Sequence, residues 1–252
     1  IGQAQIQEIG VVLVDDPTDP DATNTEFPLG EIGSHFTIQD GDIDDNPYPN
    51  DLVALQIALA KRKCLYRFCQ RMVRANSPSA ANREFAGFGD IIEANMIVTA
   101  TTPGTFVWAE LIEAISLVSN GSGMPTCVMG SRVAIREVME AIGPTDMPWT
   151  TVQSAAGEYR VPSIFGAPLL RNDMLNDAED ASKLWVLSLG DAGEQGTERG
   201  VTAIVPPNAS GDPFRIRATP VPGGSVSVDV TLPIGLAAGS QGALALYDYT
   251  TV

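Results

Sequence analysis

The sequence has little of the residue types on which metal sites and nucleophilic catalysis depend. One histidine (His35) and three cysteines (Cys64, Cys69 and Cys127) occur in 252 residues. Cys64 and Cys69 are five residues apart, which is not a metal-ligand spacing, and an odd number of cysteines does not make a disulfide framework. We interpret all three as reduced thiols that fill apolar space, which favours a reducing compartment.

Long apolar runs are also missing. No stretch reaches the roughly 18 consecutive apolar residues that a membrane-spanning helix needs, so the sequence predicts no such span. The apolar content is nevertheless 44% over 252 residues. This is enough to bury a core in one large unit or in two subdomains, and the chain is therefore predicted to be globular.

Catalytic motifs are absent from the sequence. No serine lies in a G-x-S-x-G motif, so His35 has no recognisable nucleophile to activate. The segment Gly121-Ser122-Gly123 lacks the Gly-Lys-Ser/Thr ending of a phosphate loop and is read as a turn. An acidic hydrolase with paired carboxylates is a further alternative, but nothing in the sequence places two carboxylates in one pocket. The chain is therefore predicted not to be an enzyme and to need no cofactor.

One acidic segment resembles a calcium-binding loop. Asp40, Asp42 and Asp44 lead toward a helix with the alternating spacing of such a loop. However, Asp45 stands where the loop needs glycine, and Asp51 stands where it needs glutamate. A solvated acidic linker is the favoured interpretation, and a weak cation site at Asp40, Asp42 and Asp44 is the alternative.

Positive charge is scarce and is concentrated in one segment. The net charge is −16; the first 60 residues carry twelve acids and no Lys or Arg, whereas residues 61–74 carry six bases and no acid. Four of these bases recur at helical spacing and form what we call the basic ridge: Lys63, Arg67, Arg71 and Arg74. Like charges at i, i+4 destabilise an isolated helix, so the ridge is expected to have acidic partners.

The amino-terminal acids are the preferred partners for this ridge. They include Asp15, Asp16, Asp19 and Asp21. We predict that this acidic region of a neighbouring copy binds the basic ridge. Nucleic acid binding and a plain solvated face are the two alternatives.

Hydrophobic periodicity predicts an α+β fold. Residues 51–76 contain neither Gly nor Pro and predict one long helix, whose buried stripe is expected to include Leu55, Leu59 and Tyr66. Before it, residues 6–14 and 27–38 predict the two strands of a hairpin with an acidic tip. Two further helices are expected at 106–118 and 131–142. The last hundred residues are mostly strands, including a strictly alternating one at 226–232 that predicts a sheet with one wet face.

Several segments, in this order, resemble a known family. They are FAGFGDIIEANMIV (85–98), FVWAELIEAISLV (106–118), PTCVMGSRVAIREVMEAI (125–142), FGAPLLRNDML (165–175) and LWVLSLGDAGEQGTERGVTAIV (184–205). This succession resembles the major capsid proteins of tailed double-stranded DNA phages and related archaeal viruses, which share the Hong Kong 97 fold. The resemblance extends over nearly the whole chain.

The resemblance implies a domain organisation and a function. Residues 1–45 would form the amino-terminal arm and the extended β-hairpin loop. Residues 46–105 and 212–252 would form the peripheral domain with a spine helix at 51–76, and residues 106–211 the axial domain. Copies of the chain would assemble into hexamers and pentamers of an icosahedral head, which encloses the viral double-stranded DNA without sequence-specific binding and without a membrane.

The resemblance also implies partners and a location. Portal, scaffold, maturation protease and decoration proteins are expected partners, in a virion that is assembled in the host cytoplasm. A virus protease often removes the amino-terminal region in this family, which would explain a chain that begins at Ile1. Some members form Lys–Asn links from a lysine on the extended loop, but residues 1–60 contain no lysine. An encapsulin-type nanocompartment shell, which has the same fold, is the alternative.

Overall fold

The computed structural model describes residues 29–39, 49–73, 84–121, 125–143, 147–154, 157–175, 181–190, 200–206, 212–222, 224–239 and 241–250. The chain folds into two compact units. Unit 1 comprises Ile1–Met72, Asn76–Gly87 and Ala203–Leu236, and unit 2 comprises Val73–Ala75, Phe88–Thr202 and Ala237–Val252. None of the helices in these described ranges is long and apolar enough to cross a bilayer.

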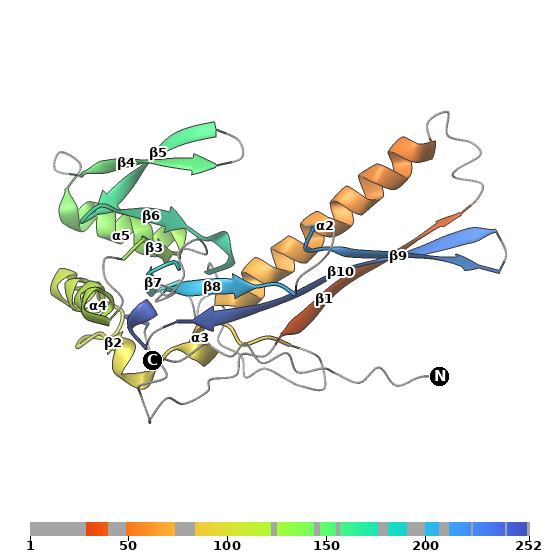
Figure 1. The fold of residues 1–252 in the computed structure, drawn as a ribbon. Helices are drawn as coiled ribbons and strands as arrows, with labels where there is room; N and C mark the ends of the chain where they lie inside the picture. Colours follow the sequence, from red (N-terminus) through yellow and green to blue (C-terminus); the bar gives the residue numbers. More distant parts are fainter. Residues whose placement is uncertain are drawn as a thin grey trace, which may run out of the picture. The chain divides into compact units, whose positions relative to one another are not determined.

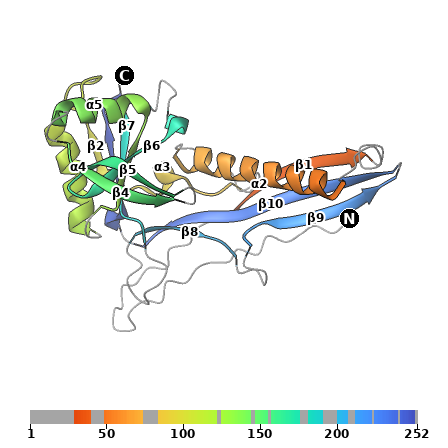
Figure 2. The same ribbon diagram turned by 90° about the horizontal axis from the view of Figure 1, so that it is seen from above.

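Unit 1 is built around the long helix α2, Pro49–Val73. Its sheet contains β1 (Gly30–Gln39), β8 (Val201–Ile204), β9 (Arg215–Val221) and β10 (Ser225–Ala238). β10 is the central strand: β1 pairs with one of its edges in antiparallel fashion, and β9 and β8 pair with the other. Figures 1 and 2 show α2 running along β1 and β10.

The strand β10 turns its apolar side chains toward α2. Val228 and Val230 form a buried cluster with Ala60 of the helix, and Ile57 and Phe36 pack against that cluster. The residues between these valines lie on the opposite face of the pleat and are more exposed. The predicted sheet with one wet face is therefore confirmed for this part of β10.

The hairpin prediction is tested in only one of its two strands. β1 confirms a strand at 30–39 where 27–38 was predicted, and one of its edges pairs with β10, with Phe36 opposite Val228. Residues 6–14, the predicted partner strand, lie outside the described residues, so the hairpin itself stays a prediction. Strand pairing is set by tertiary burial of one face, and the valines of β10 offer β1 that buried face.

Unit 2 is a seven-stranded sheet covered by helices. Its strands are β2 (Ile97–Thr99), β3 (Cys127–Gly130), β4 (Trp149–Ser154), β5 (Gly157–Ile164), β6 (Ala167–Arg171), β7 (Lys183–Leu187) and β11 (Leu244–Asp248). Their order is β2-β11-β7-β3-β6-β5-β4, and the pairs β2/β11 and β3/β6 are parallel. The closing strand β11 thus pairs with β2 and β7 of the same unit. Short helical segments connect these strands: α3 (Phe88–Ile91), η2 (Ala94–Met96), η3 (Asp173–Leu175) and η4 (Gln241–Ala243).

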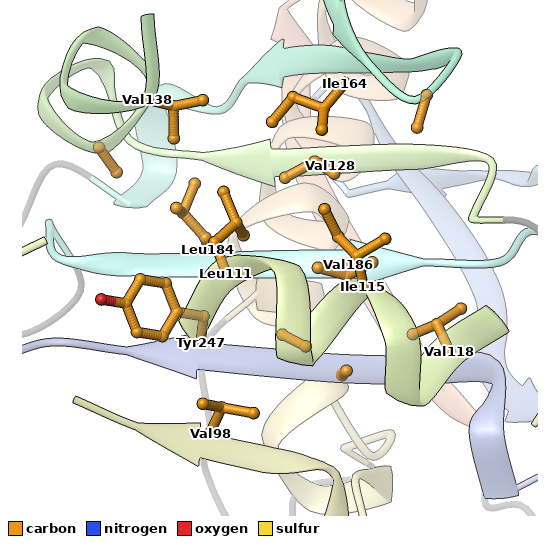
Figure 3. Packing of buried hydrophobic residues seen from close by; sticks show 14 of the residues in the cluster. Val98, Leu111, Ile115, Val118, Val128, Val138, Ile164, Leu184, Val186 and Tyr247 are labelled. Atoms are coloured by element: carbon orange, nitrogen blue, oxygen red, sulfur yellow. The ribbon is translucent and has the colours of Figure 1, made fainter. Parts of the chain in front are cut away.

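Two helices cover one face of this sheet. α4 (Trp108–Gly121) contributes Leu111, Ile115 and Val118 to the core, and α5 (Arg132–Ile142) contributes Val138. Figure 3 shows these side chains directed at the strands β3, β7 and β11. Burying each such side chain stabilises the unit by about 1.5–3 kcal/mol. The two helices were predicted at 106–118 and 131–142, and both are confirmed within two or three residues.

The helix α5 begins and ends where its sequence indicates. The Ser131 side chain accepts a hydrogen bond from the Ala134 N–H, which is the arrangement of an N-cap. Gly143 ends the helix with a positive φ of 87°, and its N–H donates to the Met139 carbonyl.

A close contact between two glycines joins the end of β7 to the start of β8. The Gly190 N–H donates to the Val201 carbonyl at 3.1 Å. A Cβ atom on Gly200 would lie only 2.1 Å from the Gly190 nitrogen, which is backbone and cannot move aside cheaply. A Cβ on Gly190 would likewise lie 2.4 Å from Thr202 Oγ1. Leu189 and Val201 form a parallel bridge, so the two segments run side by side here with no room for a side chain at either glycine.

The residue Phe165 has an unusual backbone conformation. Phe165 and Gly166 form the two-residue turn between β5 and β6, with φ values of 48° and 85°. Two positive φ values are those of a type I′ turn, which favours Asn-Gly, Asp-Gly or Gly-Gly. A bulky residue in this left-handed region costs on the order of 1–2 kcal/mol.

We predict that alanine destabilises the protein at Gly200 and has little effect at Gly33. Gly200→Ala should lower the free energy of unfolding by about 1–3 kcal/mol because the new methyl group overlaps the Gly190 backbone. Gly33→Ala is the control: its Cβ would meet only Thr231 Cγ2, at an ordinary 3.7 Å. That variant should change stability by less than about 1 kcal/mol. Urea unfolding of both variants measures the difference, and equal stabilities would contradict the close contact between Gly200 and Gly190.

Candidate functional site

The helix α2 buries a different face from the one that its apolar spacing predicts. Ala60 and Cys64 are buried, and the Cys64 thiol approaches the Val230 carbonyl at 3.7 Å. Leu55, Leu59 and Tyr66 are instead 56%, 50% and 56% exposed. The prediction of a buried stripe through these three residues is wrong, because the sheet approaches α2 along its small side chains.

Large apolar side chains are exposed on α2. Leu55, Leu59 and Tyr66 lie four and seven residues apart on one side of the helix, together with the exposed Arg62, and Leu65 is exposed beside them. We call Leu55, Leu59, Leu65 and Tyr66 the α2 stripe. Exposed apolar patches of this kind mark interaction surfaces.

The basic ridge divides into a free part and an occupied part. Arg71 Nη2 lies 2.6 Å from Glu84 Oε2, and both side chains are partly buried. Lys63 and Arg67 are exposed, and Arg67 donates a long hydrogen bond of 3.5 Å to the Gly33 carbonyl. Lys63 follows Leu59 by one helical turn, so these bases border the α2 stripe. Arg74, Asp15, Asp16, Asp19 and Asp21 lie outside the described residues.

A second charged contact holds the start of β9 to α2, and the sequence patterns did not predict it. Lys61 Nζ lies 2.6 Å from Asp212 Oδ2 and 5.1 Å from the centre of the Phe214 ring. The hydrogen bond from Lys61 lowers the pKa of Asp212, and the Phe214 N–H donates to the same carboxylate. In the sequence, Lys61 differs from the basic ridge only in that it does not share the helical spacing of Lys63, Arg67, Arg71 and Arg74.

His35 lies on the exposed face of the unit 1 sheet. Its Nδ1 is 2.8 Å from Asp229 Oδ1 and 3.5 Å from Ser227 Oγ. A catalytic triad places the serine and the carboxylate on opposite ring nitrogens, whereas here both contact the same nitrogen. The cluster is therefore a cross-strand polar contact between β1 and β10 and lacks triad geometry.

The three thiols lack the environment of reactive cysteines. Burial raises the pKa of the Cys127 thiol to about 11. Burial also raises the pKa of Cys64, although the nearby charges of Arg67 and Lys63 act in the opposite direction, and it raises that of Cys69. A reactive thiol needs a lowered pKa, so these side chains serve packing.

The carboxylate of Glu110 is held by hydrogen bonds within unit 2. It accepts hydrogen bonds from the Thr101 N–H and from the Tyr247 hydroxyl at 2.9 and 3.0 Å. The bonds from Thr101 are the main reason why the pKa of Glu110 is lowered. A general acid of a glycosidase needs a raised carboxyl pKa, so Glu110 does not fit that role.

The described ranges contain no cluster of three or more His, Cys, Asp or Glu side chains that could hold a metal ion. Asp40, Asp42 and Asp44, the residues of the alternative cation site, lie outside those ranges. That alternative stays a prediction.

Known structures share this fold across most of the chain. The holo-SrpI encapsulin complex from Synechococcus elongatus PCC 7942 matches with 18% identity and a TM-score of 0.73, over 91% of this chain and 76% of that chain. The capsid of the native GTA particle matches with 15% identity and a TM-score of 0.54, over 96% and 81%. A chain of Mycobacterium phage Bobi matches with 12% identity and a TM-score of 0.54, over 93% and 79%.

These matches establish the fold. The matching chains have the Hong Kong 97 fold, and this chain has it too. No protein-family model matches the sequence, and no curated protein matches it. The predicted fold class is thereby confirmed, while the roles of arm, spine helix, peripheral domain and axial domain stay predictions.

Two ridge residues should differ in their effect on stability. Arg71→Gln should lower the free energy of unfolding by about 1–3 kcal/mol, because it removes the charged hydrogen bond from Arg71 Nη2 to the partly buried Glu84. Lys63→Gln, on the same helix but exposed, should change it by less than about 0.5 kcal/mol. Urea unfolding of the two variants tests this, and an Arg71 variant as stable as the Lys63 variant would contradict the assigned contact.

Proposed function

We propose that this chain is a shell-building subunit, the major capsid protein of a tailed double-stranded DNA virus. Copies would form the hexamers and pentamers of an icosahedral head that encloses the genome, and the role would be structural, without catalysis. The observation that carries the proposal is the fold: it is shared over 91% and 96% of this chain with an encapsulin complex and a GTA particle capsid. The fold alone does not determine function, so surface properties must also fit.

The surface of the isolated chain suits a protein that associates with itself. The α2 stripe exposes four large apolar side chains on one helix. Because these side chains are about half exposed, covering each one would contribute roughly half of the 1.5–3 kcal/mol that full burial gives. In a closed shell each contact is repeated many times, so a modest interface supports a stable particle.

The amino-terminal segment of a neighbouring copy has the chemistry to cover this surface. Residues 6–14 are apolar except for Gln7, Glu8 and Gly10, and four aspartates follow at positions 15, 16, 19 and 21. Apolar residues would cover the α2 stripe while the aspartates meet Lys63 and Arg67. Complementary charges of this kind select the partner and its register.

The charge of the chain is also compatible with a DNA container. A net charge of −16 disfavours tight binding of the phosphate backbone, so packaged DNA would be held by enclosure. Portal, scaffold, maturation protease and decoration proteins are the other partners that we expect in a virion assembled in the host cytoplasm. The lack of lysine in residues 1–60 excludes a Lys–Asn crosslink that starts from that region.

A compartment for protein cargo is the second candidate function. One observation favours it: the TM-score with the encapsulin complex is 0.73, compared with 0.54 for the GTA particle capsid and the phage chain. Both candidates are shells and differ in their contents. An acidic hydrolase receives no support from the described carboxylates.

Electron microscopy of the purified full chain tests the shell proposal and separates the two candidates. We expect closed particles that contain DNA when the protein is isolated from its native source. Particles filled with protein would instead favour the hypothesis of a protein compartment over that of a viral capsid. A chain that stays monomeric at all concentrations would contradict both.

Charge reversal tests the proposed docking of the amino-terminal segment. Lys63→Glu with Arg67→Glu should leave the subunit folded, because both side chains are exposed, and should impair assembly in light scattering. Adding Asp15→Lys and Asp16→Lys to the same chain should restore assembly in part. Arg132→Glu, an exposed reversal on α5, is the control and should assemble normally. Normal assembly of the Lys63/Arg67 variant, or no rescue, would contradict the docking.

A further inference from the structure

The strand β9 is exposed along its whole length and has one unpaired edge. All of its residues, Arg215–Val221, are exposed. One edge pairs with β10, with Ile216 opposite Val230, and no other strand of the described ranges pairs with β9. Figure 2 shows β9 on the side of β10 that faces away from β1. Such an edge presents backbone N–H and C=O groups with which an extended peptide can form a ladder.

Two arginines determine the charge of this edge. Arg215 and Arg217 lie on the same face of β9, because side chains alternate along a strand. Arg217 is directly opposite Asp229, but that carboxylate is bonded to His35 at 2.8 Å. Among the described residues, neither arginine has an ion-pair partner. On a chain with a net charge of −16, two neighbouring bases without partners favour an acidic ligand.

The other face of β9 adds an apolar position between the two arginines. Ile216 lies opposite Val230, on the face that packs against α2, yet its side chain is 45% exposed. Charged residues on an edge strand also serve to block non-specific pairing. Protection alone gives no reason for an exposed isoleucine at the centre of the edge, whereas an added strand would cover this side chain.

A strand added to this edge has a defined side-chain pattern. Residues directly opposite each other in an antiparallel pair share a face, with Cβ atoms about 4.5–5.5 Å apart. Acids opposite Arg215 and Arg217 are therefore two residues apart, and the residue between them lies opposite Ile216. The complementary sequence is an acid, an apolar residue and a second acid. Pro220 has no N–H, so the ladder is expected to end near Thr219.

A second β9 strand does not fit this edge. Two copies of β9 paired in antiparallel fashion about Ile216 would place Arg215 of one copy opposite Arg217 of the other. Like charges directly opposite each other destabilise a strand pair. The charge pattern thus favours a different, acidic polypeptide.

We propose that the free edge of β9 binds an extended acidic peptide of a separate protein as an added strand, with Arg215 and Arg217 selecting an acid–apolar–acid sequence. Main-chain hydrogen bonds supply affinity in this mode of recognition, and the side chains on alternate positions supply specificity. The inference goes beyond the proposed function, because it names the chemistry of a partner and needs no contact between copies.

Charge exchange tests the role of the two arginines. The probe is a fluorescent, threonine-rich peptide with a central Glu-Val-Glu, and its binding to the full chain is followed by anisotropy. Arg215→Glu with Arg217→Glu should weaken binding at least about tenfold and should bind the matching Lys-Val-Lys peptide instead. Both side chains are exposed, so thermal unfolding of the variant should match that of the parent.

The matched control changes the net charge by the same amount elsewhere. Arg132→Glu with Arg160→Glu replaces two exposed arginines of unit 2, and this variant should bind the Glu-Val-Glu peptide like the parent. An equal loss of binding in the control would show that only the overall charge matters, which overturns the site at β9.

Two N-methylated peptides test the backbone ladder and need no variant of the chain. Alternate N–H groups of a strand point to opposite edges, so methylation of one alternate set should weaken binding at least about tenfold. Methylation of the other set should leave binding nearly unchanged. Equal affinity of the two peptides would show a contact through charge alone and would overturn the added strand.

One segment of the chain itself has the complementary pattern, namely Asp42-Ile43-Asp44. If the peptide binds only to the variant Asp42→Asn with Asp44→Asn, the edge belongs to that segment and the separate partner is overturned. No binding of the Glu-Val-Glu peptide to either chain also overturns the proposal. The shell function stands in both cases, because it does not depend on this edge.

Discussion

The contact between α2 and the β10 strand is the constraint on which the surface of unit 1 depends. Ala60 and Cys64 are small enough for the helix to lie close to Val228 and Val230, and this contact decides the rotation of the helix about its axis. Once that rotation is set, Leu55, Leu59 and Tyr66 must face away from the sheet. The exposure of these apolar side chains is therefore a direct consequence of how the core of unit 1 packs.

Charged contacts reinforce the same orientation. Lys61 meets Asp212 and Phe214 on one side of the helix, and Arg71 meets Glu84 near its end. Lys61 and Arg71 thus form ion pairs within the subunit, although the density of positive charge in this segment would suggest that they belong to a binding surface. Of the described residues of the basic ridge, Lys63 and Arg67 are exposed, and they border the α2 stripe; Arg62 is a further exposed base on this helix.

The sequence predicted element types well and side-chain partners poorly. The uninterrupted run 51–76 predicted α2, and the alternation around Val228 predicted the wet and dry faces of β10, because both signals are local. The prediction of which face of α2 is buried was wrong because the helix has two apolar stripes. The stripe that includes Ala60 has smaller side chains and therefore a weaker hydrophobic pattern in the sequence. Periodicity did not predict the pairing of β1 with β10 or the contact of Lys61 with Asp212, because both join positions that are distant in the sequence. It did not predict the left-handed backbone of Phe165 either, because local backbone strain leaves no hydrophobic pattern.

We propose that the apolar side chains exposed on α2 of the isolated subunit lie in contacts between copies in a shell. Hydroxyl-radical footprinting of the free subunit and of the assembled particle tests it most directly, with Leu55, Leu59 and Tyr66 as reporters. The account predicts that all three are oxidised readily in the subunit and are protected in the particle. Equal oxidation in both states would contradict it.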